Sequence, residues 1–145
     1  MLASGDVNPC FDVPLLCRLL DQLVDARGAV RRIDVSETRA HLLLVPHDSL
    51  IGSTVVISIS GDVAKIFCGV GAQLTIGADE DDADAELVSV VAGILNGGAC
   101  EYAATDETGE LRLMLTVEYE RGNYTFPVTD EILLRRIPAW DEVGA

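Results

Sequence analysis

Lysine is nearly absent from this 145-residue sequence: Lys65 is the only one, and arginine supplies the remaining basic side chains. Asp and Glu together number 24 against 10 Lys and Arg, so the formal net charge is −14 at pH 7. Such a negative field repels nucleic acid, which proteins hold through Lys and Arg contacts to phosphate, and it disfavours anionic membranes. It favours capture of a basic protein, because complementary fields raise the rate of association.

Long apolar runs are also missing, since none approaches the ~20 residues that a membrane span requires. The N-terminus lacks a basic stretch followed by an apolar one, which is the pattern of a secretory signal. We therefore expect a cytoplasmic protein. The cysteines are widely spaced and form no CxxC pair, which fits reduced and mostly buried thiols in that compartment; they are Cys10, Cys17, Cys68 and Cys100.

The sequence is poor in motifs that carry chemistry. No GxSxG segment is present, and the neighbouring residues of 47–49 (His-Asp-Ser) are too close in sequence for a typical catalytic triad. His41 and His47 are six residues apart, which matches neither a helical zinc pair nor a zinc finger. Gly69 and Gly71 lack the third glycine of a dinucleotide site and the lysine of a P-loop. We predict no catalytic residues, no metal site and no cofactor, and hence not an enzyme.

The acidic run 79–86 invites comparison with a calcium loop. It lacks the glycine at the sixth position and the glutamate at the twelfth position of an EF-hand, where Asp84 and Val90 stand. Acids also gather at the start of helices, because the first backbone amides carry partial positive charge. The helix-start interpretation is favoured, and weak calcium binding is the alternative.

Hydrophobic periodicity predicts three helices and a series of strands. Asp12 can cap a first helix that has Pro14 in its first turn and an apolar repeat from Leu15 to Val24. A second helix runs from the acidic start at 79–82 to the Asn-Gly-Gly sequence at 96–98. A short third helix is expected over 129–137, before Pro138. Strands are expected at 30–35, 41–45, 54–60, 63–68, 73–76, 100–104, 110–120 and 124–126.

This order predicts an α+β fold, because an antiparallel sheet with one apolar face can bury the apolar stripes of the helices. We expect a two-layer sandwich, with an antiparallel sheet of about six to eight strands, two main helices and the short C-terminal helix. The chain is expected to form one domain over 1–145, with loose ends at about 1–10 and at 139–145, where Trp140 lies.

Two surfaces are candidate interfaces with another protein. The first is an acidic ridge over 79–86, reinforced by the acids of the turn that follows the strand 100–104. The second is one face of the strand 110–120, whose side chains alternate. Alternation predicts a core face with Leu111, Leu113, Leu115, Val117 and Tyr119 and a mixed face with Arg112, Met114, Thr116 and Glu118. The candidate partner-binding residues are Asp79, Glu80, Asp81, Asp82, Asp84, Glu86, Asp106, Glu107, Glu110, Arg112 and Met114.

In element order, the chain resembles type III secretion chaperones, small acidic and usually dimeric proteins that bind an unfolded segment of a client. In size, acidity and lack of catalytic motifs, it resembles the immunity proteins of bacterial polymorphic toxin systems. The second resemblance implies a cytoplasmic protein that covers the basic active site of a toxin domain, and we favour it. The chaperone-like function predicts a homodimer, and a ligand-binding or enzymatic domain is a third alternative; the sequence leaves monomer and homodimer open.

Overall fold

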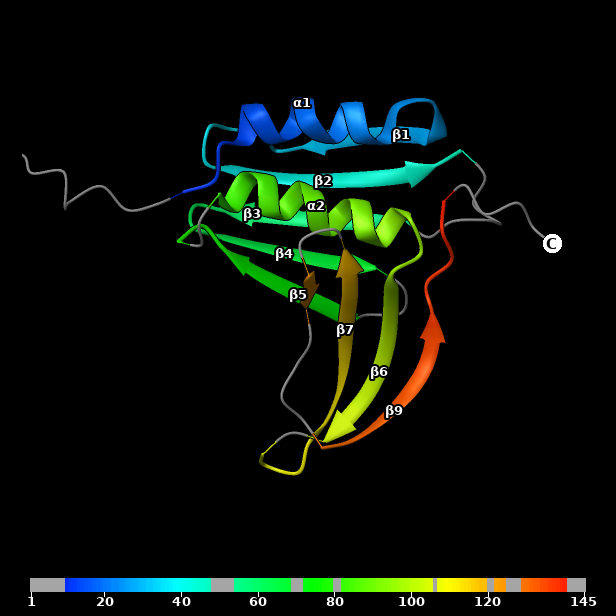
Figure 1. Cartoon of the computed structure of the whole chain (residues 1–145). Helices are drawn as coiled ribbons and strands as arrows, with labels where there is room; N and C mark the ends of the chain where they lie inside the picture. Colours follow the sequence, from blue (N-terminus) through cyan, green and yellow to red (C-terminus); the bar gives the residue numbers. More distant parts are fainter. Residues whose placement is uncertain are drawn as a thin grey trace, which may run out of the picture.

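The computed structural model describes residues 10–47, 54–68, 72–79, 82–105, 107–119, 122–124 and 129–140, which form an α+β fold (Figure 1). The α+β class was predicted from the sequence. In chain order the elements are α1 (Val13–Val24), the short 3₁₀ helix η2 (Asp25–Arg27), β1 (Gly28–Ile33), β2 (Arg39–Pro46), β3 (Val55–Ser60), β4 (Val63–Cys68), β5 (Ala72–Gly77), α2 (Ala83–Leu95), β6 (Ala99–Thr105), β7 (Leu111–Tyr119), β8 (Gly122–Tyr124) and β9 (Thr129–Arg136).

One open, curled sheet contains all the described strands. Its order is β1-β2-β3-β4-β5-β7-β6-β9, and β8 pairs with β7. The first five strands form an antiparallel meander, as predicted. The sheet is nevertheless mixed, because β5 and β7 pair in parallel through Gln73 and Met114. This corrects the prediction of an antiparallel sheet: after β5 the chain passes through α2 and β6, and β7 then lies between β5 and β6.

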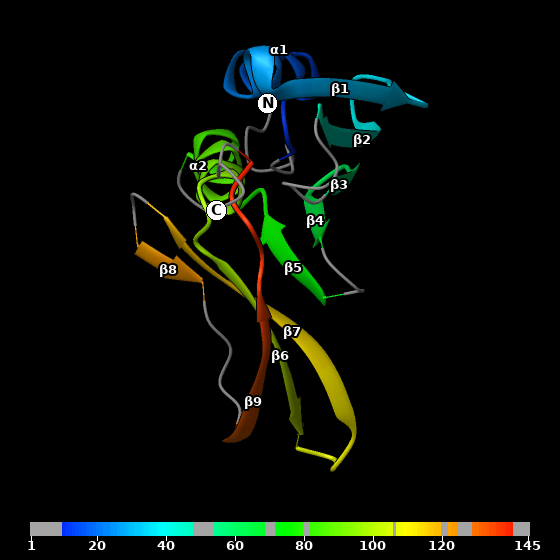
Figure 2. The same cartoon turned by 90° about the vertical axis from the view of Figure 1, so that its right-hand side faces the viewer.

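The two helices lie beside each other on one side of the curled sheet (Figures 1 and 2). The Asp12 carboxylate caps α1 by accepting a hydrogen bond from the Leu15 N–H at 3.1 Å, and Pro14 occupies the first turn as expected. Helix α1 packs on β1, β2 and α2, whereas α2 packs mainly on β7. Leu16 and Leu20 of α1 and Val91 and Ile94 of α2 are fully buried in the core between these elements.

The predicted short helix over 129–137 is wrong, because Thr129–Arg136 forms the strand β9, antiparallel to β6. The apolar residues of this segment are three in a row, Ile132 to Leu134, and such a run makes no helical stripe. Pairing with β6 also satisfies backbone groups that a helix would have left open on that edge. Pairing with β6 therefore determines that this segment forms a strand.

The end of the described chain is packed. Trp140, expected in a loose tail, is only 6 % exposed, and its backbone N–H donates to the Leu95 carbonyl at 2.8 Å. Its ring also lies against Gly28 at the start of β1. Residues 1–9 and 141–145, the outer parts of the predicted loose ends, lie outside the described residues.

Candidate functional site

The acidic ridge is only partly a free surface. Asp79 and Asp82 are exposed, while Glu80 and Asp81 lie outside the described residues. Asp82 occupies the N-cap position of α2 in the left-handed region, with φ 53°, and its side chain makes no capping hydrogen bond. These two carboxylates are therefore available to a partner.

The other two ridge acids make contacts within the protein. Asp84 accepts a hydrogen bond from the backbone N–H of Asp12 at 3.0 Å, and so links the start of α2 to the start of α1. Glu86 is partly buried and accepts a hydrogen bond from the Tyr119 hydroxyl at 2.7 Å, at the end of β7. Both side chains hold α2 in place, which is a structural role that the charge pattern alone did not reveal.

Burial raises the pKa of Asp84 above its ordinary value of 3.8; the hydrogen bond from the Asp12 N–H opposes this rise, and the Asp12 carboxylate adds to it. A carboxyl whose pKa is higher in the folded state than in the unfolded state destabilises the fold as the pH rises through that interval. Asp84→Asn keeps an oxygen acceptor but carries no charge. The variant should therefore be slightly more stable than the wild type at pH 7, and this advantage should vanish near pH 3. Urea unfolding at both pH values measures it, with the exposed Asp79→Asn as control; an equal loss at both pH values contradicts the assignment.

The acids of the β6–β7 turn are not neighbours of the ridge. Glu107 and Glu110 are exposed, and Asp106 lies outside the described residues. Glu110 precedes the first residue of β7, whereas Tyr119, which binds Glu86, is its last. A nine-residue strand is about 27 Å long, so the ridge and the turn lie at opposite ends of β7. The expectation that the turn reinforces the ridge is wrong.

The mixed face of β7 is present but uneven. Arg112 and Glu110 form a loose ion pair with 3.6 Å between their charged groups, and their side chains are 58 % and 73 % exposed. Met114 is partly buried beside Gln73 of β5 and opposite Tyr102 of β6. Of the predicted residues on this face, Arg112 is exposed and Met114 is partly buried.

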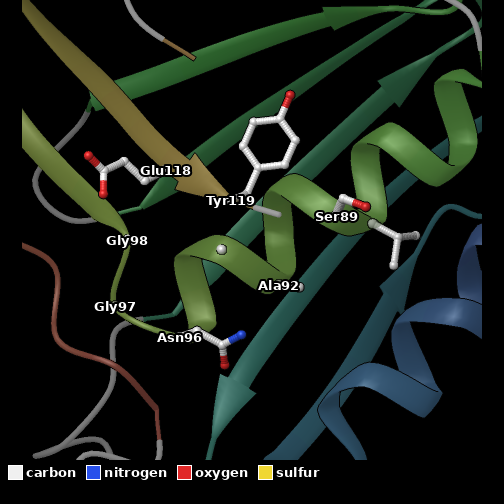
Figure 3. Close-up of a pocket in the computed structure, with 9 residues that line it drawn as sticks. Ser89, Ala92, Asn96, Gly97, Gly98, Glu118 and Tyr119 are labelled. Carbon is white, nitrogen blue, oxygen red and sulfur yellow. The ribbon is translucent and has the colours of Figure 1, made fainter. Parts of the chain in front are cut away.

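A groove of about 470 Å³ lies between α2 and the end of β7 (Figure 3). It is lined by Ser89 and Ala92 of α2, by the C-cap residue Asn96 with Gly97 and Gly98, and by Glu118 and Tyr119 of β7. Within the described ranges, no three His, Cys, Asp or Glu side chains are placed to hold a metal ion. No helix among the described elements is long and apolar enough to cross a membrane.

The feature that sequence reasoning missed is a group of exposed apolar side chains at the far end of β6, β7 and β9, where these strands extend beyond both helices (Figures 1 and 2). On β7, Leu111 is 73 % and Leu113 is 38 % exposed; on β9, Ile132, Leu133 and Leu134 are 64 %, 56 % and 47 % exposed. We call these five residues the distal surface. The alternation along β7 predicts a core face from Leu111 to Tyr119, but only Leu115 and Val117 of that face are buried.

Strand register brings the distal residues together across the sheet. Ala103 of β6 stands opposite Leu113 of β7 on one side and Ile132 of β9 on the other, so these three form a row on the face that carries the core. On the reverse face, Tyr102 stands between Met114 and Leu133 in the same way. The end of this three-stranded ribbon is therefore apolar on both faces.

A buried ion pair separates the distal surface from the core. The Glu101 side chain is fully buried, and its Oε1 accepts a hydrogen bond from Arg135 Nε at 2.7 Å, while the Arg135 side chain is 44 % exposed. Glu101 of β6 lies opposite Leu115 of β7, the last buried residue of β7 before the exposed Leu113. The carboxylate therefore lies where the core face of the sheet ends. This pair fixes β9 against β6 at the base of the distal surface.

Burial raises the pKa of the Cys68 thiol from an ordinary 9.0 to about 12; the Glu101 carboxylate adds to the rise and Arg135 opposes it. At pH 8 the reactive thiolate of Cys68 should therefore be about 1,000-fold rarer than that of an ordinary thiol. Alkylation followed by mass spectrometry should modify the exposed Cys10 first and Cys68 only after unfolding in urea. Modification of both at equal rates in the folded protein contradicts this environment.

Comparisons with known proteins found no matching family model, no similar curated protein and no similar solved structure.

Proposed function

We propose that this chain is an acidic protein-binding module that docks a basic protein on its distal surface. The observation that carries the proposal is the cluster of five large apolar side chains, each at least 38 % exposed, at the end of one three-stranded ribbon. Soluble proteins seldom leave several large apolar side chains exposed at one end of a sheet unless they serve an interaction. Its position beyond the helices leaves both faces of the ribbon accessible to a partner (Figure 2).

The surroundings of the distal surface support a basic partner. The exposed carboxylates of Glu107 and Glu110 lie at the turn next to Leu111, and the chain as a whole carries a net charge of −14. An apolar centre with a charged rim is the usual construction of a specific interface. The apolar residues contribute affinity through burial, whereas the acids raise the association rate and make it depend on salt.

An immunity protein is the specific form of this function that we favour, with the distal surface and its acidic rim covering the basic active site of a toxin domain. The chaperone-like alternative, a homodimer that binds a client segment, is supported by a different observation: β9 is an edge strand with three exposed apolar residues. Salt-dependent affinity for a folded basic domain favours the first, and binding of an extended segment favours the second.

Photo-crosslinking in the producing cell tests the docking surface and supplies the partner. A benzophenone amino acid placed at 113 or at 132 should yield one crosslinked protein with a basic sequence. The same group at exposed Lys65 on β4, outside the distal surface, should yield none. The captured protein is then purified for affinity measurements with variants of the full chain.

Leu113→Asp should weaken binding of that partner at least about tenfold, because a charge replaces an apolar contact at the centre of the surface. Lys65→Asp also introduces an aspartate, but outside the distal surface, and it should leave the affinity unchanged. Glu110→Lys should reduce the on-rate and its salt dependence with little change in off-rate. If Leu113→Asp binds like the wild type, or if the same crosslinking group captures a protein at position 79 of the acidic ridge but not at 113 or 132, the proposal is overturned.

A further inference from the structure

We propose that a pocket at the β1–β2 turn binds a free α-amino acid with an apolar side chain. The pocket has a volume of about 350 Å³ and is lined by Asp34, Ser36, Arg39 and His41. This volume lies at the lower end of the range for small-molecule sites. The pocket is at the β1 end of the sheet, whereas the distal surface includes β9 at the opposite end. The inference therefore does not depend on the docking proposal.

The pocket brings together two opposite charges that are not paired with each other. Asp34 supplies a carboxylate and Arg39 supplies a guanidinium group, and both residues are exposed. Within the described parts of the chain, neither of these side chains forms a hydrogen bond or an ion pair. A ligand that carries both an ammonium group and a carboxylate can therefore bind both of them.

The turn that forms the pocket is fixed by its own hydrogen bonds. The Ser36 hydroxyl accepts from the Arg39 backbone N–H at 3.1 Å, and the Ser36 N–H donates to the Arg39 carbonyl at 2.8 Å. The Thr38 carbonyl accepts from the Gly61 N–H at 2.8 Å, which ties this turn to the turn between β3 and β4. The pocket is therefore formed before the ligand arrives, and binding requires little further ordering.

The regular geometry of β2 places a second donor beside Arg39. Arg39 and His41 are two residues apart on this strand, and both are exposed while Ala40 between them is buried. Their side chains therefore project from the same face of the sheet, about 7 Å apart. A carboxylate has two oxygens, so the guanidinium group can bind one of them and an imidazole N–H can donate to the other.

An exposed apolar side chain adjoins this pair. Ile33, the last residue of β1, stands directly opposite His41 and is 46 % exposed. Opposite residues of an antiparallel pair lie on the same face, with their Cβ atoms about 5 Å apart. An apolar ligand side chain would cover part of Ile33 and remove both from water, which favours binding.

Charge favours a zwitterion over a simple anion as the ligand. The Asp34 carboxylate lies in the pocket and the chain carries a net charge of −14, so a phosphate ion is repelled. An amino acid has no net charge, and its ammonium group is attracted to Asp34 while Arg39 binds its carboxylate. The apolar surface of Ile33 selects an amino acid with an apolar side chain.

An NMR titration of the full chain with L-leucine tests this site. The backbone amide signals of residues 33–41 should shift and reach saturation, whereas those of the distal surface should stay in place. L-leucinamide, which lacks the carboxylate, and N-acetyl-L-leucine, which lacks the ammonium group, should each bind at least about tenfold more weakly. Glycine should also bind about tenfold more weakly, because it has no side chain to cover Ile33.

Arg39→Gln should lower the affinity for L-leucine at least about tenfold. The matched control is Arg31→Gln, which removes an exposed arginine of the same face outside the pocket lining and should leave the affinity unchanged. Asp34→Asn keeps the turn, because asparagine tolerates the left-handed conformation that residue 34 adopts with φ 51°. It should weaken binding of L-leucine about tenfold without weakening binding of N-acetyl-L-leucine.

Three results would each overturn the inference: no saturable shift with L-leucine, equal binding of L-leucine and N-acetyl-L-leucine by the wild type, or wild-type affinity in Arg39→Gln. Unchanged amide signals away from the pocket show that each variant is folded. Leu113→Asp should bind L-leucine like the wild type, which separates this result from failure of the docking proposal.

Discussion

Gly93→Ala should lower the free energy of unfolding by about 2 kcal/mol, although alanine is a better helix former than glycine. A Cβ atom at Gly93 would lie 2.7 Å from both the Glu118 carbonyl oxygen and Tyr119 Cβ, where α2 crosses the end of β7. Helix propensity favours alanine by about 1 kcal/mol. A side-chain rotation cannot relieve a contact with a backbone atom, so the added methyl group overpacks the site at a cost of about 3 kcal/mol, the upper end of the usual range. This cost exceeds the gain in helix propensity, which leaves the net loss.

Thermal unfolding measures the effect of Gly93→Ala as a decrease in Tm of about 4–8 °C for a domain of this size. Ser89→Ala, one turn earlier on the same helix, is the matched control, because alanine there gains propensity and adds no atom. The control should stay within about 0.5 kcal/mol of the wild type. A Gly93→Ala protein that is more stable than the wild type contradicts the close approach of α2 to β7.

Arg135→Ala should cost about 2–3 kcal/mol, because it removes a cation from the fully buried carboxylate of Glu101. Breaking a wholly buried ion pair costs about 3–5 kcal/mol, and the lower figure applies here because the Arg135 side chain is 44 % exposed. Urea unfolding at neutral pH gives the difference in free energy.

Arg112→Ala is the control for this measurement, because the Arg112–Glu110 pair is exposed on both sides and should contribute less than about 0.5 kcal/mol. The double variant Glu101→Met with Arg135→Met should recover much of the loss, since an apolar pair needs no compensating charge. Equal stabilities of Arg135→Ala and Arg112→Ala contradict a structural role for the buried pair.

The parts of the fold that sequence predicts are those set by local chemistry. The Asp12 cap and the apolar stripe of α1 specify a helix whatever that helix packs against. Gly61, with φ 61°, specifies the turn between β3 and β4. The parallel contact of β5 with β7 and the strand β9 depend on which segments meet after the crossover. No spacing within residues 129–136 contains that information.

The candidate site was predicted less well, for two physical reasons. Alternation along β7 reports which side chains share a face, but it does not report where the covering helix ends, so Leu111 and Leu113 were expected in the core. A run of acids reports charge, but it does not report which carboxylates accept hydrogen bonds within the fold, as Asp84 and Glu86 do. Exposure and hydrogen bonding both depend on the folded structure and cannot be read from the order of the residues.

Hydrogen–deuterium exchange of the full chain, alone and with its crosslinked and purified partner, tests the central claim most directly. Binding should slow amide exchange at residues 102–105, 111–114 and 129–134, where the distal surface lies, and leave the start of α2 unchanged. Protection confined to residues 79–86 and the start of α2, with none at the end of β6, β7 and β9, would contradict it.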